Sequence, residues 1–444
     1  MNAIDFSQYF VMFILIIIMF IPARYVYYFL IILALFDTSG PDFPSSSQIG
    51  ILNVLKTIFL PLLLIIRFRF KPLATIVRRK KPLALYAFLL FALYALMATL
   101  WSPYKLSALK MVGFFLGYLL WFTVIMWGWL SKKIDIRLVK GLFFLSIVLG
   151  IFQSTILDSS FGTEEQRFTA FISPQEYAAL VVITSIIIFT NSNQVKRLEK
   201  HLVLITALVV VFLTGSRTYF ISLILSILIL WLISWKDLYR RLLPNITILI
   251  VGKLIILLTI LIFAEQGIGS SRTAELRYIV SAPERIGTLT WRIGMYHETL
   301  RGILSAGIPE LLVGHGTSSG ADIAFRIDSR RYLPETIDAN RVIHNEFLRS
   351  LYEWGILGLT LILFITIYII ISAFWLSFRS SDHTLLAAMP PFIAGLLVEN
   401  VLAFSASGWG IGVILVIGLT YAKRLEVRRE HASYYCLVNN KAIC

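Results

Sequence analysis

The stretch of sequence that decides the fold is ISLILSILILWL, residues 221–232. Its residues do not alternate between apolar and polar, as they would in the roughly ten-residue strands of a membrane barrel. Apolar runs of this kind recur along the whole chain, each close to the ~20 residues that cross a ~30 Å hydrocarbon core as a helix. The pattern predicts an all-α integral membrane protein.

The composition and the placement of charge agree with this class. Of 444 residues, 58 % are hydrophobic and only 15 % are charged, which is too few charges to cover a surface in water. The net charge of +15 would suit nucleic acid, but the basic residues cluster immediately beside apolar runs. That is the positive-inside pattern, so we expect no nucleic-acid partner. The clusters assigned to the cytoplasm are residues 67–81, 132–140, 196–200, 236–241 and 423–429.

With these clusters placed in the cytoplasm and each apolar segment crossing the membrane, the sequence predicts about twelve transmembrane helices, with both ends of the chain in the cytoplasm. Pro22 and Arg24 interrupt the first segment, which is either one kinked span or two short ones; two would place the N-terminus outside. The expected spans are residues 9–36, 51–68, 82–101, 108–130, 141–157, 177–190, 202–213, 218–235, 246–264, 350–374, 385–402 and 409–421. The expected organisation is an N-terminal membrane region 1–264 (spans 1–9), one long external loop 265–349, a C-terminal membrane region 350–423 (spans 10–12) and a cytoplasmic tail 424–444.

The external loop, residues 265–349, is the one hydrophilic stretch large enough to hold structure of its own. It contains ten arginines and no lysine, although lysine is plentiful in the cytoplasmic clusters. The planar guanidinium binds phosphate oxygens in pairs, so this set favours recognition of a diphosphate. The alternative is that ten acidic residues in the same loop neutralise the arginines on a solvated surface.

Familiar metal and nucleotide motifs do not occur in the sequence. It has no DxD, HExxH or Walker pattern, and its two cysteines, Cys436 and Cys444, form no CxxC pair. The glycines of residues 314–320 do not have dinucleotide-binding spacing and are expected to form turns. If the protein is an enzyme, we therefore expect no metal or other cofactor, and a donor that is already activated and already in the membrane.

Three arginines on the outer side are candidates for holding such a donor. Arg217 stands between two apolar runs, where a charge is costly unless it is paired or faces a polar cavity; the alternative is a side chain snorkelling at a helix end. Arg167 lies in another outer loop and is equally compatible with a plain surface residue. Arg292 falls on a helix-like stretch beside Trp291 and Tyr296, which suit the membrane interface.

Two further polar groups complete the set of candidates. His344 stands just before the tenth span, and its ordinary pKa would let it accept a proton from a sugar hydroxyl near neutrality. The alternative is a capping or hydrogen-bonding histidine. Glu399 and Asn400 interrupt an apolar run, where they either pair with the arginines of the loop or bond between helices. His297 and His315 share the loop but lack comparable surroundings.

These residues resemble the conserved C-terminal region of the O-antigen ligase/O-antigen polymerase family. The resemblance covers about residues 101–359, and the order of its short motifs carries it. The motifs are WSP at 101–103, RFTAF at 167–171, SR at 216–217, TLTWR at 288–292, PELLVGHG at 309–316, HNEFL at 344–348 and EWGILGL at 353–359.

Membership would imply a GT-C-like fold and a metal-independent, inverting transfer from an undecaprenyl-diphosphate-linked saccharide to an acceptor hydroxyl. The resemblance implies that Arg292, Arg217 and Arg167 of this chain bind the diphosphate and that His344 assists the acceptor. Members often have tryptophan four residues after the loop arginine, where this chain has Tyr296. That departure leaves Arg285 as an alternative to Arg292.

The resemblance leaves several functions open. A polymerase for O-antigen, exopolysaccharide or capsule is favoured, with a ligase joining O-antigen to the lipid A core as the alternative. A flippase for lipid-linked oligosaccharide is the candidate from another class, although its ionisable residues should lie near the bilayer midplane. The expected location is the bacterial inner membrane with the active site facing outward. Expected partners are the lipid-linked donor, a glycan or lipid-linked acceptor, membrane lipids and other polysaccharide-assembly proteins.

Overall fold

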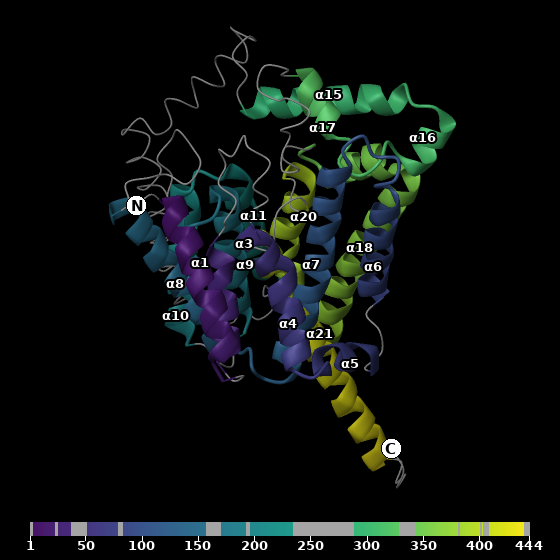
Figure 1. Ribbon diagram of the computed structural model, residues 1–444. Helices are drawn as coiled ribbons and strands as arrows, with labels where there is room; N and C mark the ends of the chain where they lie inside the picture. Colours follow the sequence, from purple (N-terminus) through teal and green to yellow (C-terminus); the bar gives the residue numbers. More distant parts are fainter. Residues whose placement is uncertain are drawn as a thin grey trace.

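Helices standing side by side in a bundle form the body of the protein (Figure 1). This computed structural model describes residues 3–22, 25–36, 51–78, 83–156, 170–191, 196–233, 288–327, 343–380, 382–399, 402 and 408–438. Among those residues there is no β-strand, only an isolated bridge between Phe36 and Phe171. The all-α class expected from the sequence is therefore confirmed.

The elements are long helices joined by short turns. In chain order they are α1 Ala3–Phe20, α2 Val26–Ile32, η1 Leu33–Leu35, α3 Ile51–Val54, η2 Leu55–Phe59, α4 Leu60–Arg67, α5 Lys71–Arg78, α6 Leu83–Met97, α7 Lys105–Leu130, α8 Ile136–Ile156, α9 Pro174–Thr190, α10 Arg197–Leu213, α11 Arg217–Ile233, α15 Thr288–Leu304, α16 Ile308–Val313, α17 Ala321–Ile327, α18 Glu346–Ser380, α19 Thr384–Ala387, α20 Met389–Val398 and α21 Gly408–Val438.

The helix α9 occupies the centre of the bundle. Almost all of its side chains are buried, as expected of a helix that is apolar all round and lies inside a bundle. The helices α8, α10, α11 and α21 pack around it. In turn α21 packs along α7, where Gly410 lies against the ring of Tyr118 so closely that a Cβ would overlap the ring. Close packing of this kind holds helices together in lipid.

The lengths of the helices fit a membrane protein. Three described helices are long and apolar enough to cross a bilayer by length and composition, namely Lys105–Leu130, Ile136–Gln153 and Glu346–Arg379. Other described apolar helices, such as α6, α9 and α11, have 10–17 residues and are shorter than a typical span. The expected ninth span, residues 246–264, lies outside the described residues, so the count of about twelve stays a prediction.

The first apolar segment folds as two antiparallel helices, not as the single span 9–36. Pro22 lacks an N–H group and ends the helical hydrogen bonding of α1. Arg67, from the first basic cluster, donates to carbonyl oxygens at the end of α1, so α1 ends at the face that carries this cluster. Phe36, directly after η1, stacks on Phe10 of α1 with ring centroids 4.5 Å apart, so the chain has turned back. Of the two arrangements that the sequence left open, the described residues contain the two short helices, so α1 begins at the end of the bundle opposite the basic cluster. The side of the membrane on which the chain begins stays a prediction.

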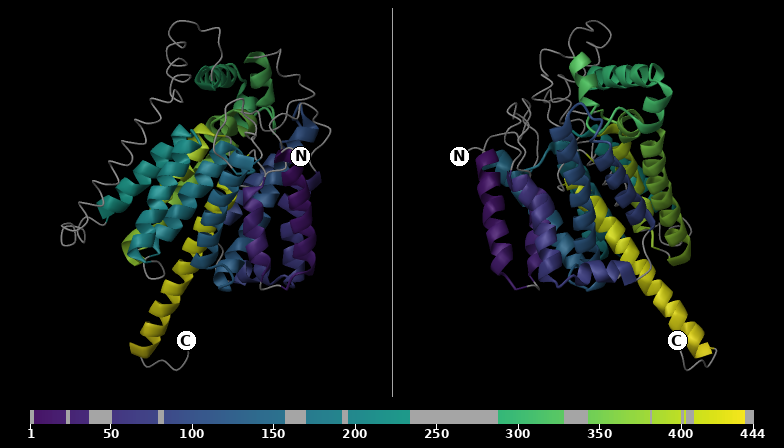
Figure 2. Two further views of the ribbon diagram at one scale, coloured as in Figure 1. Left: turned by 90° about the vertical axis from the view of Figure 1, so that its left-hand side faces the viewer. Right: turned by 45° about the vertical axis from the view of Figure 1, so that its right-hand side comes forward.

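The last helix continues well past the membrane region. α21 runs unbroken from Gly408 to Val438 and projects beyond the other helices at the end of the bundle opposite α15 (Figure 2). The expected tail, residues 424–444, therefore begins as a helical continuation of the last span.

Three short helices cover the other end of the bundle. α15 lies across this end, with α16 and α17 next to it (Figures 1 and 2). They have a small apolar core of their own, separate from the core of the bundle, built from Met295 of α15, Ile323 of α17, Tyr352 of α18 and Ile343, which precedes α18. The external loop expected from the sequence thus contains a packed helical cap, and α18 begins at Glu346, inside the expected loop.

The cap joins the bundle where two glycine-containing turns meet. α18 is interrupted at Gly355, whose φ is 62°, and Gly314 opposite it has φ 80°. The backbones approach so closely that a Cβ at Gly355 would overlap the carbonyl group of Leu312. The N–H of His315 donates to the carbonyl of Tyr352 at 3.0 Å. The glycines expected to form turns therefore do so, and they also make this close contact possible.

Substituting Gly355 should loosen the joint between cap and bundle. Alanine at a positive φ costs on the order of 1–3 kcal/mol before any clash is counted, so Gly355→Ala should lower the thermal midpoint of the purified protein in detergent. Gly141→Ala is the matched control, because its Cβ would meet nothing within 4 Å and alanine favours a helix. Equal midpoints for the two variants would contradict this account of the joint.

Reporter fusions test which end of the bundle faces outward. Fusions at Thr75, Lys133 and Arg428 should score cytoplasmic, while fusions at Ser102 and Ser319 should score external. Fusions at Ser102 and Ser319 must give the same score, because Ser102 hydrogen-bonds to the turn that holds Ser319. Fusions at Thr75 and Lys133 must also agree, because Thr75 lies on α5, which packs against α7 near Lys133. An internal score at Ser319 would contradict the assignment.

Candidate functional site

One face of α15 presents Arg292 to the end of the bundle. Arg292 shares this face with Met295 and Tyr296, which follow it by three and four residues. Met295 is fully buried in the core of the cap, and the Tyr296 hydroxyl donates to the backbone carbonyl of His344 at 2.6 Å. Packing and a hydrogen bond thus fix the helix face that directs Arg292 toward α20.

Arg292 forms a buried ion pair with Glu399. Its Nη2 atom lies 3.1 Å from Oε1 and 3.2 Å from Oε2 of Glu399, the residue that directly follows α20. The two side chains are only 18 % and 8 % exposed. Removing one partner of such a pair should be costly, because the other charge would remain buried and uncompensated.

His344 adjoins this pair from the start of α18. Its Nδ1 lies 4.0 Å from Oε2 of Glu399. Burial, and after it the positive charge of Arg292, lower the pKa of His344 to about 3. The imidazole is therefore neutral at physiological pH, with a lone pair free to accept a proton. Arg292, Glu399 and His344 are called the outer cluster below.

The outer cluster holds polar atoms that have no partner. Nε of Arg292 and Nδ1 of His344 are both buried and make no hydrogen bond in the described part of the chain. Buried polar groups are nearly always paired, so each unpaired one needs an explanation, and a bound water, ion or ligand is one of the explanations. An anion could take up the guanidinium N–H, and a hydroxyl could donate to the imidazole.

A second, fully buried network lies directly below the outer cluster. Arg349 of α18 pairs with Glu346 at 3.3 Å and with Glu353 at 3.2 Å, and all three side chains are 0 % exposed. Glu346 also accepts from the N–H of Leu402 at 2.8 Å, and Glu353 accepts from the N–H of Ser318 at 2.9 Å. The network therefore fastens the start of α18 to the segment after α20 and to the turn before α17.

This network changes the interpretation of the loop arginines. Arg349 was one of the ten counted toward diphosphate recognition, but it is buried inside α18 and both carboxylates neutralise it. Arg349 thus fits neither interpretation as stated: carboxylates neutralise it, but in a buried network and not on a solvated surface. Arg301, by contrast, is exposed on α15 and only 3.9 Å from Glu298.

Arg217 lies at the same end of the bundle but not in the outer cluster. It begins α11 after the tight turn at Gly215, where φ is 67°, and its side chain is exposed. α11 packs along α20, and Tyr219 of α11 lies within electrostatic range of Arg292 and Glu399. No ion pair or hydrogen bond joins Arg217 to the outer cluster among the described residues.

The remaining candidates fall elsewhere. Arg167 and the alternative Arg285 lie outside the described residues, as does Asn400. His297 is exposed on α15, and His315 stacks on Tyr352 with centroids 4.3 Å apart, away from the outer cluster.

The sequence predicted that Glu399 has a polar partner but did not identify that partner. A lone glutamate in an apolar run signalled a buried partner, and pairing with a loop arginine was one of two alternatives; the structure pairs it with Arg292. The sequence also did not suggest that Tyr296 supports His344 through a backbone hydrogen bond. No residue pattern signals a contact between positions 48 residues apart.

The comparisons with known proteins bear on the same region. Residues 202–363 match the family model described as O-Antigen ligase. The matched region begins in α10, ends in α18 and includes Arg217, Arg292 and His344. No curated protein matches the chain. Members of the matched family are membrane-bound ligases and polymerases. Residues 202–363 therefore form a region similar to the O-antigen ligase family, and the resemblance to the O-antigen ligase/polymerase family that the motifs predicted is confirmed over this region.

Proposed function

We propose that the protein is a membrane glycosyltransferase that moves a saccharide from an undecaprenyl-diphosphate-linked donor to an acceptor hydroxyl at the outer face of the inner membrane. The observation that carries this proposal is the outer cluster. It combines a guanidinium with an unpartnered N–H and a neutral imidazole beside a carboxylate, and two of its three residues lie within the family domain.

In this proposal the arginines hold the leaving group. Arg292 binds the diphosphate, with Arg217 at the neighbouring helix end and Arg167 as further contacts. As the bond between the anomeric carbon and the diphosphate breaks, negative charge develops on the leaving oxygen. A guanidinium fixed in a poorly hydrated site stabilises that charge, and such a donor typically lowers the barrier by about 3–4 kcal/mol.

His344 and Glu399 act on the acceptor. The acceptor oxygen attacks the anomeric carbon from the side opposite the diphosphate, which inverts the configuration, and its proton passes to Nδ1 of His344. Glu399, 4.0 Å away, stabilises the imidazolium that forms. Undecaprenyl diphosphate leaves with the electron pair of the broken bond, and the reaction uses no metal.

Binding of the donor prepares the base for this step. The charge of Arg292 is the second cause that lowers the pKa of His344. A diphosphate on Arg292 neutralises that charge, so the pKa of His344 rises and the imidazole becomes a stronger base only when a donor is present. Burial, the larger cause, remains.

A polymerase is the preferred reaction within the family, with a second lipid-linked repeat unit as acceptor. In a ligase the acceptor would be the outer-core sugar of lipopolysaccharide. The same residues serve both reactions, so the glycan products separate them: a polymerase makes long chains on the polyprenyl carrier, and a ligase makes them on lipid A.

Substitutions of Arg292 test its grip on the diphosphate. Arg292→Lys keeps the charge beside Glu399 but removes the planar fork, so transfer should fall by about 10²–10³-fold, nearly as far as in Arg292→Ala. Arg301→Lys on the exposed side of α15 is the matched control and should keep wild-type activity. Donor and product glycans are extracted from cells at matched membrane abundance. Wild-type amounts of long product from Arg292→Lys would contradict the assignment.

Substitution of His344 tests the proton transfer separately. His344→Gln should lower the transfer rate by about 10²–10⁴-fold while donor still binds, so lipid-linked donor accumulates on the outer leaflet. His297→Gln, an exposed histidine of the same cap, should change neither. Because the pKa of His344 lies well below 6.5, the wild-type rate should not fall between pH 8 and pH 6. A rate that halves near pH 6.5, or donor trapped on the cytoplasmic leaflet, would count against this role; the second result would indicate a flippase.

A further inference from the structure

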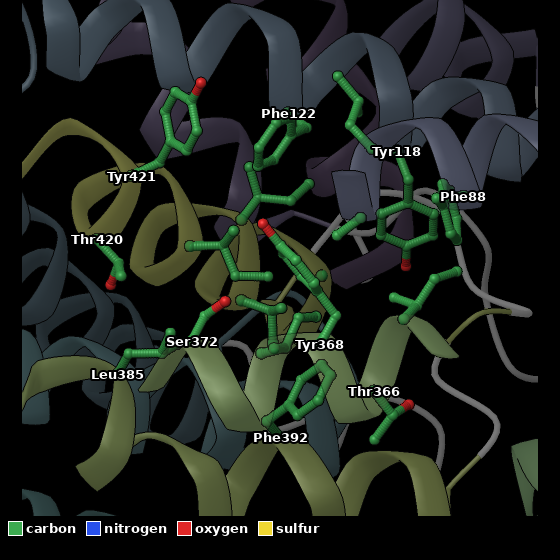
Figure 3. Close-up of a pocket in the computed structure, with 18 of the residues that line it drawn as sticks. Phe88, Tyr118, Phe122, Thr366, Tyr368, Ser372, Leu385, Phe392, Thr420 and Tyr421 are labelled. Carbon is green, nitrogen blue, oxygen red and sulfur yellow. The ribbon is translucent and has the colours of Figure 1, made fainter. Parts of the chain in front are cut away.

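An apolar groove runs between the helices of the bundle, away from the outer cluster. Residues of α6, α7, α18, α20 and α21 line it, and its volume is about 180 Å³. Figure 3 shows Tyr368 of α18 in the middle of the groove, between Phe122 of α7 and Phe392 of α20. Cavities with walls of this kind exclude water and accept hydrocarbon; one of ~150 Å³ binds benzene.

The groove is long in the direction of the helices. Its lining runs from Ile362 to Leu376 along α18 and from Trp409 to Arg424 along α21. Each stretch corresponds to about 20 Å at the rise of an α-helix. One leaflet of a bilayer, half of a ~30 Å hydrocarbon core, is about 15 Å deep. The walls of the groove are therefore long enough to lie beside a single acyl chain over the depth of one leaflet.

Two arginines stand at the end of the groove farthest from α15. Arg424, which lines the groove, lies 4.7 Å from the ring centroid of Trp375, and Arg379 lies 5.5 Å from the same ring. Neither arginine has a carboxylate partner among the described residues, and Nε of Arg424 is buried without a hydrogen bond. The neighbouring carboxylate, Asp382, is paired with Lys423 at 3.1 Å.

We propose that this groove is a binding site for an anionic phospholipid of the cytoplasmic leaflet. One acyl chain fills the groove, and the phosphate lies between Arg379 and Arg424 at the end assigned to the cytoplasm by the positive-inside pattern. Guanidinium groups suit a phosphate because they bind its oxygens in pairs, and the ring of Trp375 holds both in position. A zwitterionic lipid also carries a cationic group, which the guanidinium groups of Arg379 and Arg424 would repel, so it should bind less tightly.

The isoprenoid tail of the glycan donor is a less suitable occupant. Its diphosphate would lie at the outer cluster, at the opposite end of the bundle, and would leave Arg379 and Arg424 without an anion. The phospholipid site accounts for both the apolar walls and the two cations. It does not depend on the proposed transferase activity.

Native mass spectrometry of the delipidated full-length protein in detergent tests the proposal. Phosphatidylglycerol should bind at least about tenfold more tightly than phosphatidylcholine, and Arg379→Gln/Arg424→Gln should weaken phosphatidylglycerol binding by roughly tenfold to thirtyfold. Arg137→Gln is the charge control, because Arg137 is an exposed arginine of the same face outside the groove. Equal affinities for the two lipids in the wild-type protein would overturn the proposal, as would an unchanged double variant.

A second pair of variants tests the groove without touching the charges. Ser372→Phe, which places a ring inside the groove, should weaken phosphatidylglycerol binding by on the order of tenfold, whereas Ile367→Phe, on the exposed side of α18, should not. Full binding by Ser372→Phe would overturn the proposal. So would displacement of phosphatidylglycerol by equimolar undecaprenyl phosphate, because the groove would then belong to the isoprenoid chain. If the arginine double variant fails to fold, these results and the wild-type comparison still decide.

Discussion

The buried network of Glu346, Arg349 and Glu353 is the interaction on which the outer end of the molecule depends. Two carboxyl groups share one guanidinium in a site with no access to water, and this burial disfavours negative charge. The N–H groups of Leu402 and Ser318 offset this penalty by donating to the two carboxylates. Because breaking a buried pair typically costs about 3–5 kcal/mol, the start of α18, the segment after α20 and the turn before α17 are held as one unit.

The outer cluster takes its geometry from that unit. His344 precedes Glu346 by two residues and Glu399 precedes Leu402 by three, so the backbone bonds of the network set the separation of imidazole and carboxylate. Arg292 comes from a different source, the apolar core of the cap. Its position relative to Glu399 thus depends on Gly314 and Gly355, where cap and bundle meet at a distance that no side chain would allow.

Much of this architecture could be predicted from the sequence because the membrane imposes simple constraints. Long apolar runs and adjacent basic clusters predicted helices, and the family motifs predicted the neighbourhood of Arg292 and His344. The turn at Pro22 was harder, since a proline either kinks a helix or ends it, and only the contacts of Arg67 and Phe36 distinguish these outcomes. Burial of individual arginines could not be predicted either. Arg349 and Arg292 look alike in sequence, yet Arg349 is fully buried between two carboxylates of its own helix, whereas Arg292 is 18 % exposed and pairs with Glu399 from another segment.

The position of the outer cluster at one end of the bundle agrees better with the proposed enzyme, whose site would lie at the membrane surface, than with a transporter. A transporter must offer polar groups near the bilayer midplane, where its substrate passes. In the described part of this bundle the outer cluster and the network lie at the end capped by α15, and the groove has apolar walls. The buried Lys56, beside the middle of α7, donates to the backbone carbonyl of Phe36. Burying a charged group in the hydrocarbon core is costly. At the edge of the core, where water is scarce, the attraction between a charged side chain and a lipid headgroup is stronger than in water. A reaction that releases a lipid diphosphate needs that location, because its leaving group stays in the membrane while its acceptor arrives from water.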